Sequence, residues 1–340
     1  MKILAIQFRY LGDAVLMTPA LRAIKEHFPG CLLHVLVAQE AAPLLEHLPE
    51  LHRVWAFPRV RGKAKLLSSW PILRALRQER FERSVDFCGN DRGALVTLIC
   101  GARERLAPFR RGGFFARRIC YTRTVRSAPE PHQARNNFGV LSAWGIEPPA
   151  CPEIEIRADP SRAGLAEQLL PRHAILCHIA TSQPKKEWPL GHWVEFYRGA
   201  WGTGHELVFC AGTAPREQAM LADLRQRLPG VPTLPALPEL ATFLAVLNRA
   251  RLFISGDTGP LHFAAGLRVP TIALFGPSSP AQWAPLGPKH RALRGEACSC
   301  GGGTAVCLSA SHCMASISPQ QVLETLQEVL AMTQCGTSAR

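Results

Sequence analysis

No run of eighteen or more apolar residues occurs in this 340-residue sequence, and the first apolar run, at 3–6, is broken by Gln7 and Arg9. These absences argue against a membrane-spanning helix and a secretory signal peptide. The chain also lacks an internal repeat of fixed period, a GxGxxG fingerprint and a GxxxxGK[ST] loop. Nucleotide binding in the manner of dehydrogenases or P-loop enzymes is therefore not expected. We expect a cytoplasmic protein that can touch a membrane surface.

Cysteine is too sparse for a disulfide scaffold, with 12 residues in 340, and several lie inside apolar runs, such as Cys177 and Cys210. Reduced thiols are the simpler interpretation. Four cysteines near the C-terminus could form a zinc or iron–sulfur site, with His312 beside the last of them. These are Cys298, Cys300, Cys307 and Cys313. Their spacing is not the paired CxxC of zinc ribbons, so structural thiols and no metal are favoured, while the metal site stays open.

The composition indicates a globular protein of about two domains, because 47% of the residues are apolar and 19% are charged. The charge is unevenly distributed: residues 1–150 hold 23 Lys and Arg against 12 Asp and Glu, out of totals of 39 and 26. Most of the excess lies between Arg53 and Arg126. Such a basic field indicates an anionic partner, which could be nucleic acid, anionic lipid or an acidic substrate, although a solvated face is the alternative for scattered charges.

Short apolar runs alternate with amphipathic segments along most of the chain, which predicts an α/β fold with parallel sheets. One helix is expected over 14–28. The proline-rich segment 148–160 resembles a linker carrying one strand. The predicted domains are 1–152 and 153–318, followed by a helix at 319–333 that packs back on the first domain. Ligands of open parallel sheets bind outside the carboxyl ends of the strands, so a cleft between two such units is the expected site.

Asp13 follows the first strand and a turn that contains Gly12, which is expected to give the turn its freedom. Aspartate is a common helix N-cap, and that role alone would explain Asp13. The functional alternative is a carboxylate that takes a proton from an acceptor hydroxyl. At a helix start it would be held ionised and would be a weak base.

A second candidate site is the turn Ser255-Gly-Asp-Thr-Gly-Pro-Leu-His262, between a strand and a helix. Backbone N–H groups at a helix start bind phosphate, Thr258 adds a hydroxyl, and His262 lies one turn further. A capped loop with no ligand is the plainer alternative.

The segment from His178 to Pro189 is the third candidate. Thr181, Ser182, Lys185 and Lys186 place two hydroxyls and two ammonium groups after a strand, which suits a departing diphosphate. A polar surface loop with a tryptophan anchor is the alternative interpretation.

Three stretches of the chain together resemble the heptosyltransferases of glycosyltransferase family 9. They are LAIQFRYLGDAVLMTPALRAIKEHFPG, TSQPKKEWP and SGDTGPLHFAAGLRVPTIALFGPSSPAQWAPLG. The resemblance implies a GT-B fold of two Rossmann-like domains around a cleft. It implies inverting transfer of heptose from ADP-heptose to the inner core of lipopolysaccharide, without a metal cofactor.

The resemblance also implies roles for single residues. Asp13 matches the general base, and Thr181, Ser182 and Lys186 match the loop that holds the donor phosphates, with Lys185 as a competing contact. The donor site of the second domain matches Asp257, Thr258, Gly259 and His262.

The basic stretch would then face an acidic acceptor at the cytoplasmic side of the inner membrane. Arg59, Arg61, Lys63 and Lys65 are its candidate contacts. A transferase that uses another nucleotide sugar is the first alternative. A nucleic-acid-binding module is a remote one, because no recognition motif or stacking platform is present.

Overall fold

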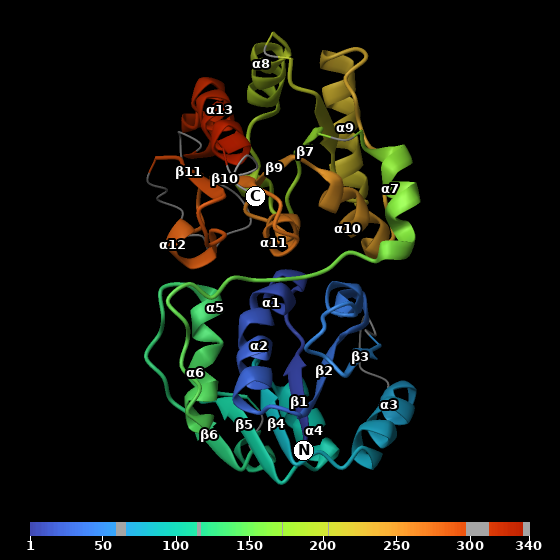
Figure 1. The fold of residues 1–340 in the computed structure, drawn as a ribbon, viewed down its shortest axis with the longest axis vertical. Coiled ribbons are helices and arrows are strands. Elements are labelled where there is room, and N and C mark those ends of the chain that lie inside the picture. The colour runs from blue at the N-terminus through green and yellow to red at the C-terminus, as the bar shows by residue number, and fades with distance from the viewer. Residues whose placement is uncertain (59–65, 114–116, 172, 203, 297–312, 336–340) are drawn as a thin grey trace. The chain divides into compact units, whose positions relative to one another are not determined.

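The computed structural model describes residues 1–58, 66–113, 117–171, 173–202, 204–296 and 313–335 (Figure 1). The chain divides into two compact units, Met1–Arg157 and Ala158–Arg340. The sequence-based boundary at 152/153 lies just before this division, in a segment that forms neither helix nor strand. Among the described residues, no helix combines the length and the apolar character needed to cross a membrane.

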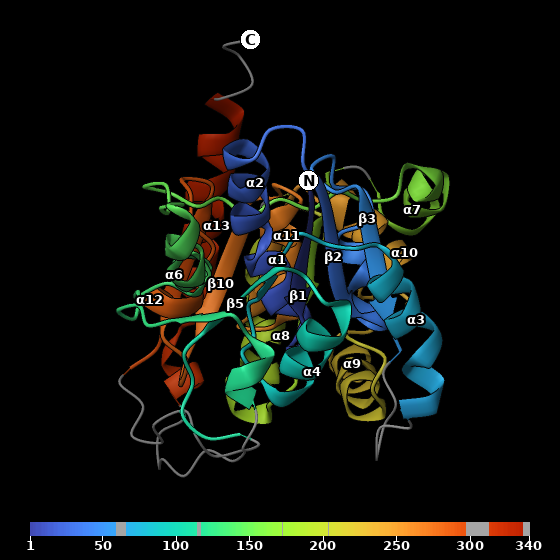
Figure 2. The ribbon, with the colours of Figure 1, turned by 90° about the horizontal axis from the view of Figure 1, so that it is seen from below.

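The described residues of the first unit form a six-stranded parallel sheet in the order β3-β2-β1-β4-β5-β6. Its strands are β1 (Lys2–Gln7), β2 (Leu32–Ala38), β3 (Arg53–Phe57), β4 (Arg83–Asp86), β5 (Glu104–Pro108) and β6 (Arg123–Val125). Its helices are α1 (Leu11–Leu16), α2 (Thr18–His27), α3 (Leu66–Gln78), α4 (Asp91–Cys100), α5 (Gln133–Asn136) and α6 (Phe138–Leu141), with 3₁₀ turns η1 (Gln39–Leu44), η2 (Arg117–Cys120) and η3 (Ser142–Trp144). Figure 2 shows α2 and α4 on opposite faces of this sheet.

The core of the first unit forms because the central strands are apolar on both sides, as expected for parallel strands covered by helices. Leu4 and Ile6 of β1 pack with Leu73 and Leu76 of α3 and with Val96 of α4. All five side chains are at most 4% exposed.

The second unit repeats this arrangement with a five-stranded parallel sheet in the order β11-β10-β9-β7-β8, within the described residues. Its strands are β7 (Ile175–His178), β8 (Leu207–Cys210), β9 (Leu252–Gly256), β10 (Thr271–Phe275) and β11 (His290–Arg294). Its helices are α7 (Ala163–Leu169), α8 (Leu190–Trp201), α9 (Pro215–Arg227), α10 (Leu240–Arg249), α11 (Gly259–Gly266), α12 (Pro280–Trp283) and α13 (Pro319–Cys335), with 3₁₀ turns η4 (Pro160–Arg162), η5 (Pro184–Lys186) and η6 (Cys313–Ser316).

The C-terminal helix α13 contributes to the core of the second unit. Val322 and Leu326 pack in one apolar cluster with Trp193 and Phe196 of α8, and α13 and α8 lie side by side. Trp188 Nε1 donates to Ile317 O at 2.8 Å, which ties the loop before α8 to the segment before α13. The expectation that this helix also packs on the first unit stays a prediction.

The strand order of each sheet reverses direction beside its first strand. In the first unit β1 lies between β2 and β4, and in the second unit β7 lies between β8 and β9. The crevice at such a topological switch point is where open α/β sheets bind ligands. A ligand site is therefore expected at the loops that follow β1 and β4, and at those that follow β7 and β9.

The helix expected over 14–28 is broken into α1 and α2 near Met17. The break arises because Pro19 has no N–H to donate to the carbonyl of Val15. Thr18 Oγ1 donates to that carbonyl instead, at 2.8 Å.

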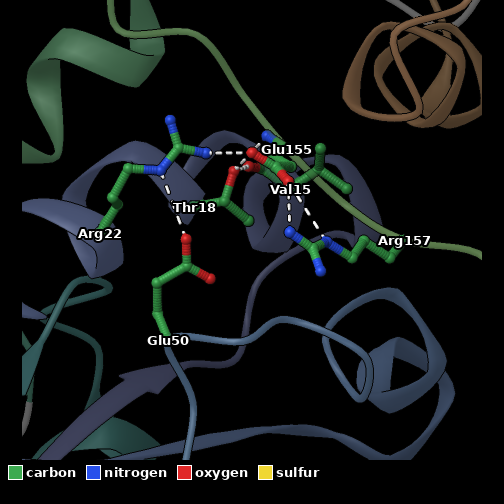
Figure 3. A network of polar contacts seen from close by, with 6 residues as sticks. All are labelled: Val15, Thr18, Arg22, Glu50, Glu155 and Arg157. Carbon is green, nitrogen blue, oxygen red and sulfur yellow. Dashed lines mark hydrogen bonds and ion pairs between the residues drawn. The ribbon is translucent and has the colours of Figure 1, made fainter.

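The strand expected in segment 148–160 is not formed. The polar groups of Glu155 in this segment bond instead to side chains of α2 and to Arg157 (Figure 3). Glu155 N donates to Thr18 Oγ1 at 3.0 Å, and Arg22 Nη2 donates to Glu155 Oε2 at 2.6 Å. Arg22 Nε also donates to Glu50 Oε1 at 3.4 Å, and Arg157 lies 3.3 Å from Glu155 Oε1. The segment is thus fixed to the first unit by side-chain bonds rather than by a sheet.

Candidate functional site

Asp13 lies at the carboxyl end of β1, in the first turn of α1, and only 5% of it is exposed. The residue that starts the helix is Tyr10, so the expected N-cap role for Asp13 is wrong. Its Oδ2 accepts a hydrogen bond from Tyr10 N at 3.2 Å. Its Oδ1 accepts no hydrogen bond within the described residues and lies 3.8 Å from Arg9 Nη1. One carboxylate oxygen is therefore available to an incoming donor.

Burial raises the pKa of Asp13 above its ordinary value, although the Arg9 charge and the Tyr10 amide act in the opposite direction. The pKa shift is therefore opposite in direction to the one expected from the helix start. Desolvation makes the carboxylate a stronger base than an exposed aspartate. Gly12 also differs from the expectation: it lies inside α1 and is not among the residues with a positive φ.

A buried polar network that the sequence did not reveal lies beside Asp13, between the ends of β1 and β4. Gln7 Oε1 accepts from Cys88 Sγ at 2.7 Å and from Arg9 N at 3.2 Å. Cys88 Sγ accepts from Phe8 N at 2.9 Å. These bonds join the two loops at the switch point, so the backbone before Asp13 is held on the β4 side.

Asp86, the last residue of β4, is fully buried and belongs to the same network. It accepts from Cys88 N at 2.8 Å and from Tyr121 Oη at 2.7 Å. Desolvation raises the pKa of Asp86 to about 6, against the lowering effect of these bonds. Gly93 of α4 packs directly against Asp86. A Cβ at this position would lie 2.1 Å from Asp86 Oδ2, so no larger residue fits there. Both oxygens of Asp86 are occupied, which distinguishes it from Asp13.

In the second unit, Lys186 and Asp257 form an ion pair with Nζ and Oδ2 2.6 Å apart. Lys186 ends the 3₁₀ turn after β7, and Asp257 directly follows β9, so the pair joins the two loops at this switch point. The Lys186 side chain is 22% exposed and that of Asp257 is 8% exposed. Lys186 is thus held in a fixed position but can still reach a ligand.

Gly256 allows the two loops to approach each other. A Cβ at Gly256 would lie 2.7 Å from Lys186 O and 3.0 Å from Thr181 Cγ2. Distances this short would force the 181–186 loop away. The strand-end glycine is therefore required by close packing, and the sequence pattern alone did not identify it.

Glu187 and Arg216 hold the same loop, and sequence reasoning missed both. Glu187 Oε1 accepts from Thr181 N at 2.9 Å and from Arg216 Nη1 at 2.8 Å, and Arg216 also donates to Thr181 O. Thr181 Oγ1 donates to Gln183 O at 2.6 Å. Its hydroxyl hydrogen therefore shapes the loop in this structure.

The turn after β9 presents Thr258 as the N-cap of α11. Pro260 has no amide hydrogen, and Leu261 N donates to Thr258 O at 3.1 Å. Among the described residues of the first turn of α11, this leaves the Gly259 amide as the backbone group that can donate to a ligand. His262 is 5% exposed, and its ring centroid lies 6.4 Å from that of Trp283.

The remaining candidates have different surroundings. Ser182 is exposed, whereas Lys185 is 2% exposed. Lys186 is therefore the better placed of the two lysines. Arg59, Arg61, Lys63 and Lys65 lie outside the described residues, as do Cys298, Cys300 and Cys307. Cys313 is described and is buried beside Gly276, and the described residues contain no group of three His, Cys, Asp or Glu side chains that could hold a metal ion.

Comparison with known proteins gives a consistent result. A family model for glycosyltransferase family 9 (heptosyltransferase) matches residues 70–302. The chain is 24% identical to lipopolysaccharide heptosyltransferase 3 of Escherichia coli, over 82% of this chain and 84% of that protein. It is 24% identical to lipopolysaccharide heptosyltransferase 2 of Salmonella typhimurium, over 97% of this chain and 99% of that protein.

A solved structure described as E. coli ADP-heptose lipopolysaccharide heptosyltransferase II superposes with a TM-score of 0.78 at 21% identity, covering 98% of this chain and 100% of that one. At this identity the likeness concerns the fold, and it confirms the expected α/β fold of GT-B type. The family match extends over more than half of the sequence and includes both loops of the second unit and the end of β4. The chain is a glycosyltransferase and belongs to glycosyltransferase family 9, the heptosyltransferases.

Proposed function

We propose that this enzyme transfers heptose from ADP-heptose to the inner core of lipopolysaccharide, with inversion at the anomeric carbon. Asp13 accepts the proton of the acceptor hydroxyl as the oxygen attacks that carbon. The bond from the anomeric carbon to the diphosphate oxygen breaks in the same step, and ADP departs with the bonding electrons.

The surroundings of Asp13 support the role of general base. Its pKa is raised by burial, and its Oδ1 has no hydrogen-bond donor within the described residues. A base of this kind can receive a hydroxyl hydrogen without breaking an existing bond. Tyr10 N holds the other oxygen and so fixes the direction of the carboxylate.

The donor diphosphate would bind at the loops after β7 and β9. Lys186 and the Gly259 amide provide positive charge and a hydrogen-bond donor, and Thr258 adds a hydroxyl at the start of α11. Charge that grows on a leaving diphosphate is stabilised by donors already in place. Asp257 keeps Lys186 in position and adjoins the donor site.

The observation that carries this proposal is the Lys186–Asp257 pair beside the first turn of α11, in a chain of family 9. The test is an assay of ADP-heptose against a set of truncated lipopolysaccharide cores, with Lys186→Gln as the comparison. We expect transfer to one core and a large loss of kcat in the variant. Equal turnover in both proteins would remove Lys186 from the mechanism.

A transferase of the same fold with a different nucleotide sugar is the second candidate. A donor panel separates the two, because activity with another sugar nucleotide and none with ADP-heptose would establish the alternative.

We propose that the enzyme works from the cytoplasm at the face of the inner membrane, without a metal cofactor and without nucleic acid. Retention of turnover in a chelator is the check on the metal.

A further inference from the structure

Two neighbouring helices of the first unit carry exposed stripes that mix large apolar side chains with arginine. On α3 the stripe is Trp70, Arg74 and Arg77, at helical spacing, with Trp70 61% exposed. On α4 it is Arg92, Leu95 and Leu98, with the two leucines 44% and 42% exposed. We call these six residues together with Ile119 the α3–α4 face.

The stripes belong to one surface because α3 and α4 pack side by side (Figure 2). Arg77 of α3 lies against Gly101, the left-handed residue that ends α4, where a Cβ would fall 1.2 Å from Arg77 Nη1. The turn η2 packs on α4 as well and carries Ile119, which is 72% exposed.

The chemistry of this face fits a lipid surface. Soluble proteins usually scatter exposed apolar side chains, and several gathered on one face mark an interaction site. Helix α3 contains no carboxylate and α4 contains one, the exposed Asp91 at its start, whereas three arginines lie on the face. Arginine stems can lie along apolar groups while their charges reach phosphate. Tryptophan and leucine beside arginine are typical of elements that lie in the interface of an anionic membrane.

We propose that the α3–α4 face docks on the surface of an anionic bilayer. This proposal depends on the proposed function in one respect: the lipid-anchored acceptor of that function would lie at such a membrane surface. Helix α4 follows β4 and begins at the carboxyl edge of the sheet, the same edge at which Asp13 follows β1. Docking on this face would keep that edge near the membrane, where a lipid-linked acceptor presents its sugars.

The test measures co-sedimentation of the full chain with vesicles of phosphatidylglycerol and phosphatidylethanolamine, and with phosphatidylcholine vesicles for comparison. We expect binding to the anionic vesicles only. The double variant Leu95→Ser with Leu98→Ser should lower partitioning at least about tenfold. Arg74→Gln with Arg92→Gln should lower partitioning about twenty-fivefold, because each arginine near such a surface contributes roughly fivefold.

Trp201→Ser is the matched control, because Trp201 is 69% exposed on α8 of the second unit. It should bind vesicles like the parent, and thermal unfolding should show that all variants fold. Equal partitioning of every variant, or no binding by the parent, would overturn the proposal. The proposal would also be overturned if the parent self-associates and these variants abolish the self-association without changing vesicle binding.

Transfer to a lipid-free core oligosaccharide separates this proposal from the function itself. The face variants should retain that activity. If the parent lacks it but binds vesicles through this face, the proposed function fails and the docking surface stands.

Discussion

Asp13 and Asp86 are both buried carboxyl groups at the same edge of the first sheet, but their hydrogen bonding differs. Asp86 accepts bonds on both oxygens, from Cys88 N and from Tyr121 Oη, whereas Asp13 keeps Oδ1 free of hydrogen bonds within the described residues. Burial raises the pKa of both. The free oxygen suits Asp13 to accept a proton, and the occupied oxygens suit Asp86 to hold the loops in place.

Asp13→Asn should abolish most turnover and stabilise the protein at neutral pH. Loss of a general base costs about 10²- to 10⁴-fold in kcat, while donor binding in the second unit should persist. Stability should rise because burial disfavours the ionised carboxylate, and the amide still accepts from Tyr10 N. Steady-state kinetics, ADP titration and thermal unfolding measure the three effects, with the exposed Asp91→Asn as control. Unchanged kcat would exclude Asp13 as the base.

Asp86→Asn should change how stability depends on pH. The folded-state pKa of Asp86 is about 6, above the ordinary 3.8, so its contribution to stability is greatest below about pH 4 and is lost as the pH rises through 6. The loss amounts to about 3 kcal/mol. Between pH 4 and 7 the free energy of unfolding of the variant should therefore rise relative to that of the parent, by up to this amount.

Urea unfolding of the parent and of Asp86→Asn at several pH values measures this gain. Burial lowers the pKa of His34, His178 and His290 to about 4, and these residues reduce stability as the pH falls below their ordinary value. Their contribution is the same in both proteins and cancels in the difference. Parallel pH profiles would contradict the assigned pKa of Asp86.

At the scale of elements, the sequence predicted an α/β fold with parallel sheets because the apolar runs of such strands are buried on both faces. It placed Asp13, Lys186 and Asp257 at strand ends for the same reason. It missed the break at Pro19, the fixed but strandless segment around Glu155, and the supporting contacts of Gly256 and Arg216. These features depend on bonds between residues far apart in the chain, which local patterns do not contain.

Gly256→Ala should weaken ADP binding through the packing of two loops. The added Cβ would meet Lys186 O at 2.7 Å and Thr181 Cγ2 at 3.0 Å, so the 181–186 loop must move. Because a shift of about 1 Å in a positioned group costs about a hundredfold, we expect a clear loss of donor affinity or kcat. Gly199→Ala is the control, since its Cβ would make only an ordinary contact with Leu323 at 3.4 Å. Calorimetric ADP titration compares them, and equal affinities would contradict the packing argument.

Thr18→Val should release the segment around Glu155. The substitution removes the acceptor of Glu155 N and the donor to Val15 O while nearly preserving volume (Figure 3). Leaving a buried polar group unpaired costs about 1–3 kcal/mol. Hydrogen exchange should accelerate at Glu155, and thermal stability should fall. Arg157→Gln removes only an exposed ion pair and should change neither measurement by much. If the Glu155 amide stays protected from exchange in Thr18→Val, the bond from Glu155 N to Thr18 Oγ1 does not hold the segment.

At the scale of the whole molecule, most of the net positive charge and the proposed nucleotide contacts belong to different parts of the chain. Residues 1–150 hold 23 basic against 12 acidic side chains, whereas 151–340 hold 16 against 14. The second unit contacts its proposed donor through a few groups held in place by short bonds, such as the Lys186–Asp257 pair. A broad basic surface and a small preorganised site respond differently to salt.

Raising the salt concentration should therefore separate the two kinds of binding. Between about 0.1 M and about 1 M ionic strength the Debye length falls from about 10 Å to about 3 Å, so attraction between exposed arginines and a charged surface is largely lost. Partitioning to anionic vesicles should fall more than about tenfold. ADP affinity should change much less, because Lys186 is only 22% exposed and acts at contact distance. Vesicle sedimentation and ADP titration over the same salt series make the comparison, and an equal loss in both would show that one shared basic surface, rather than two separate sites, binds both partners.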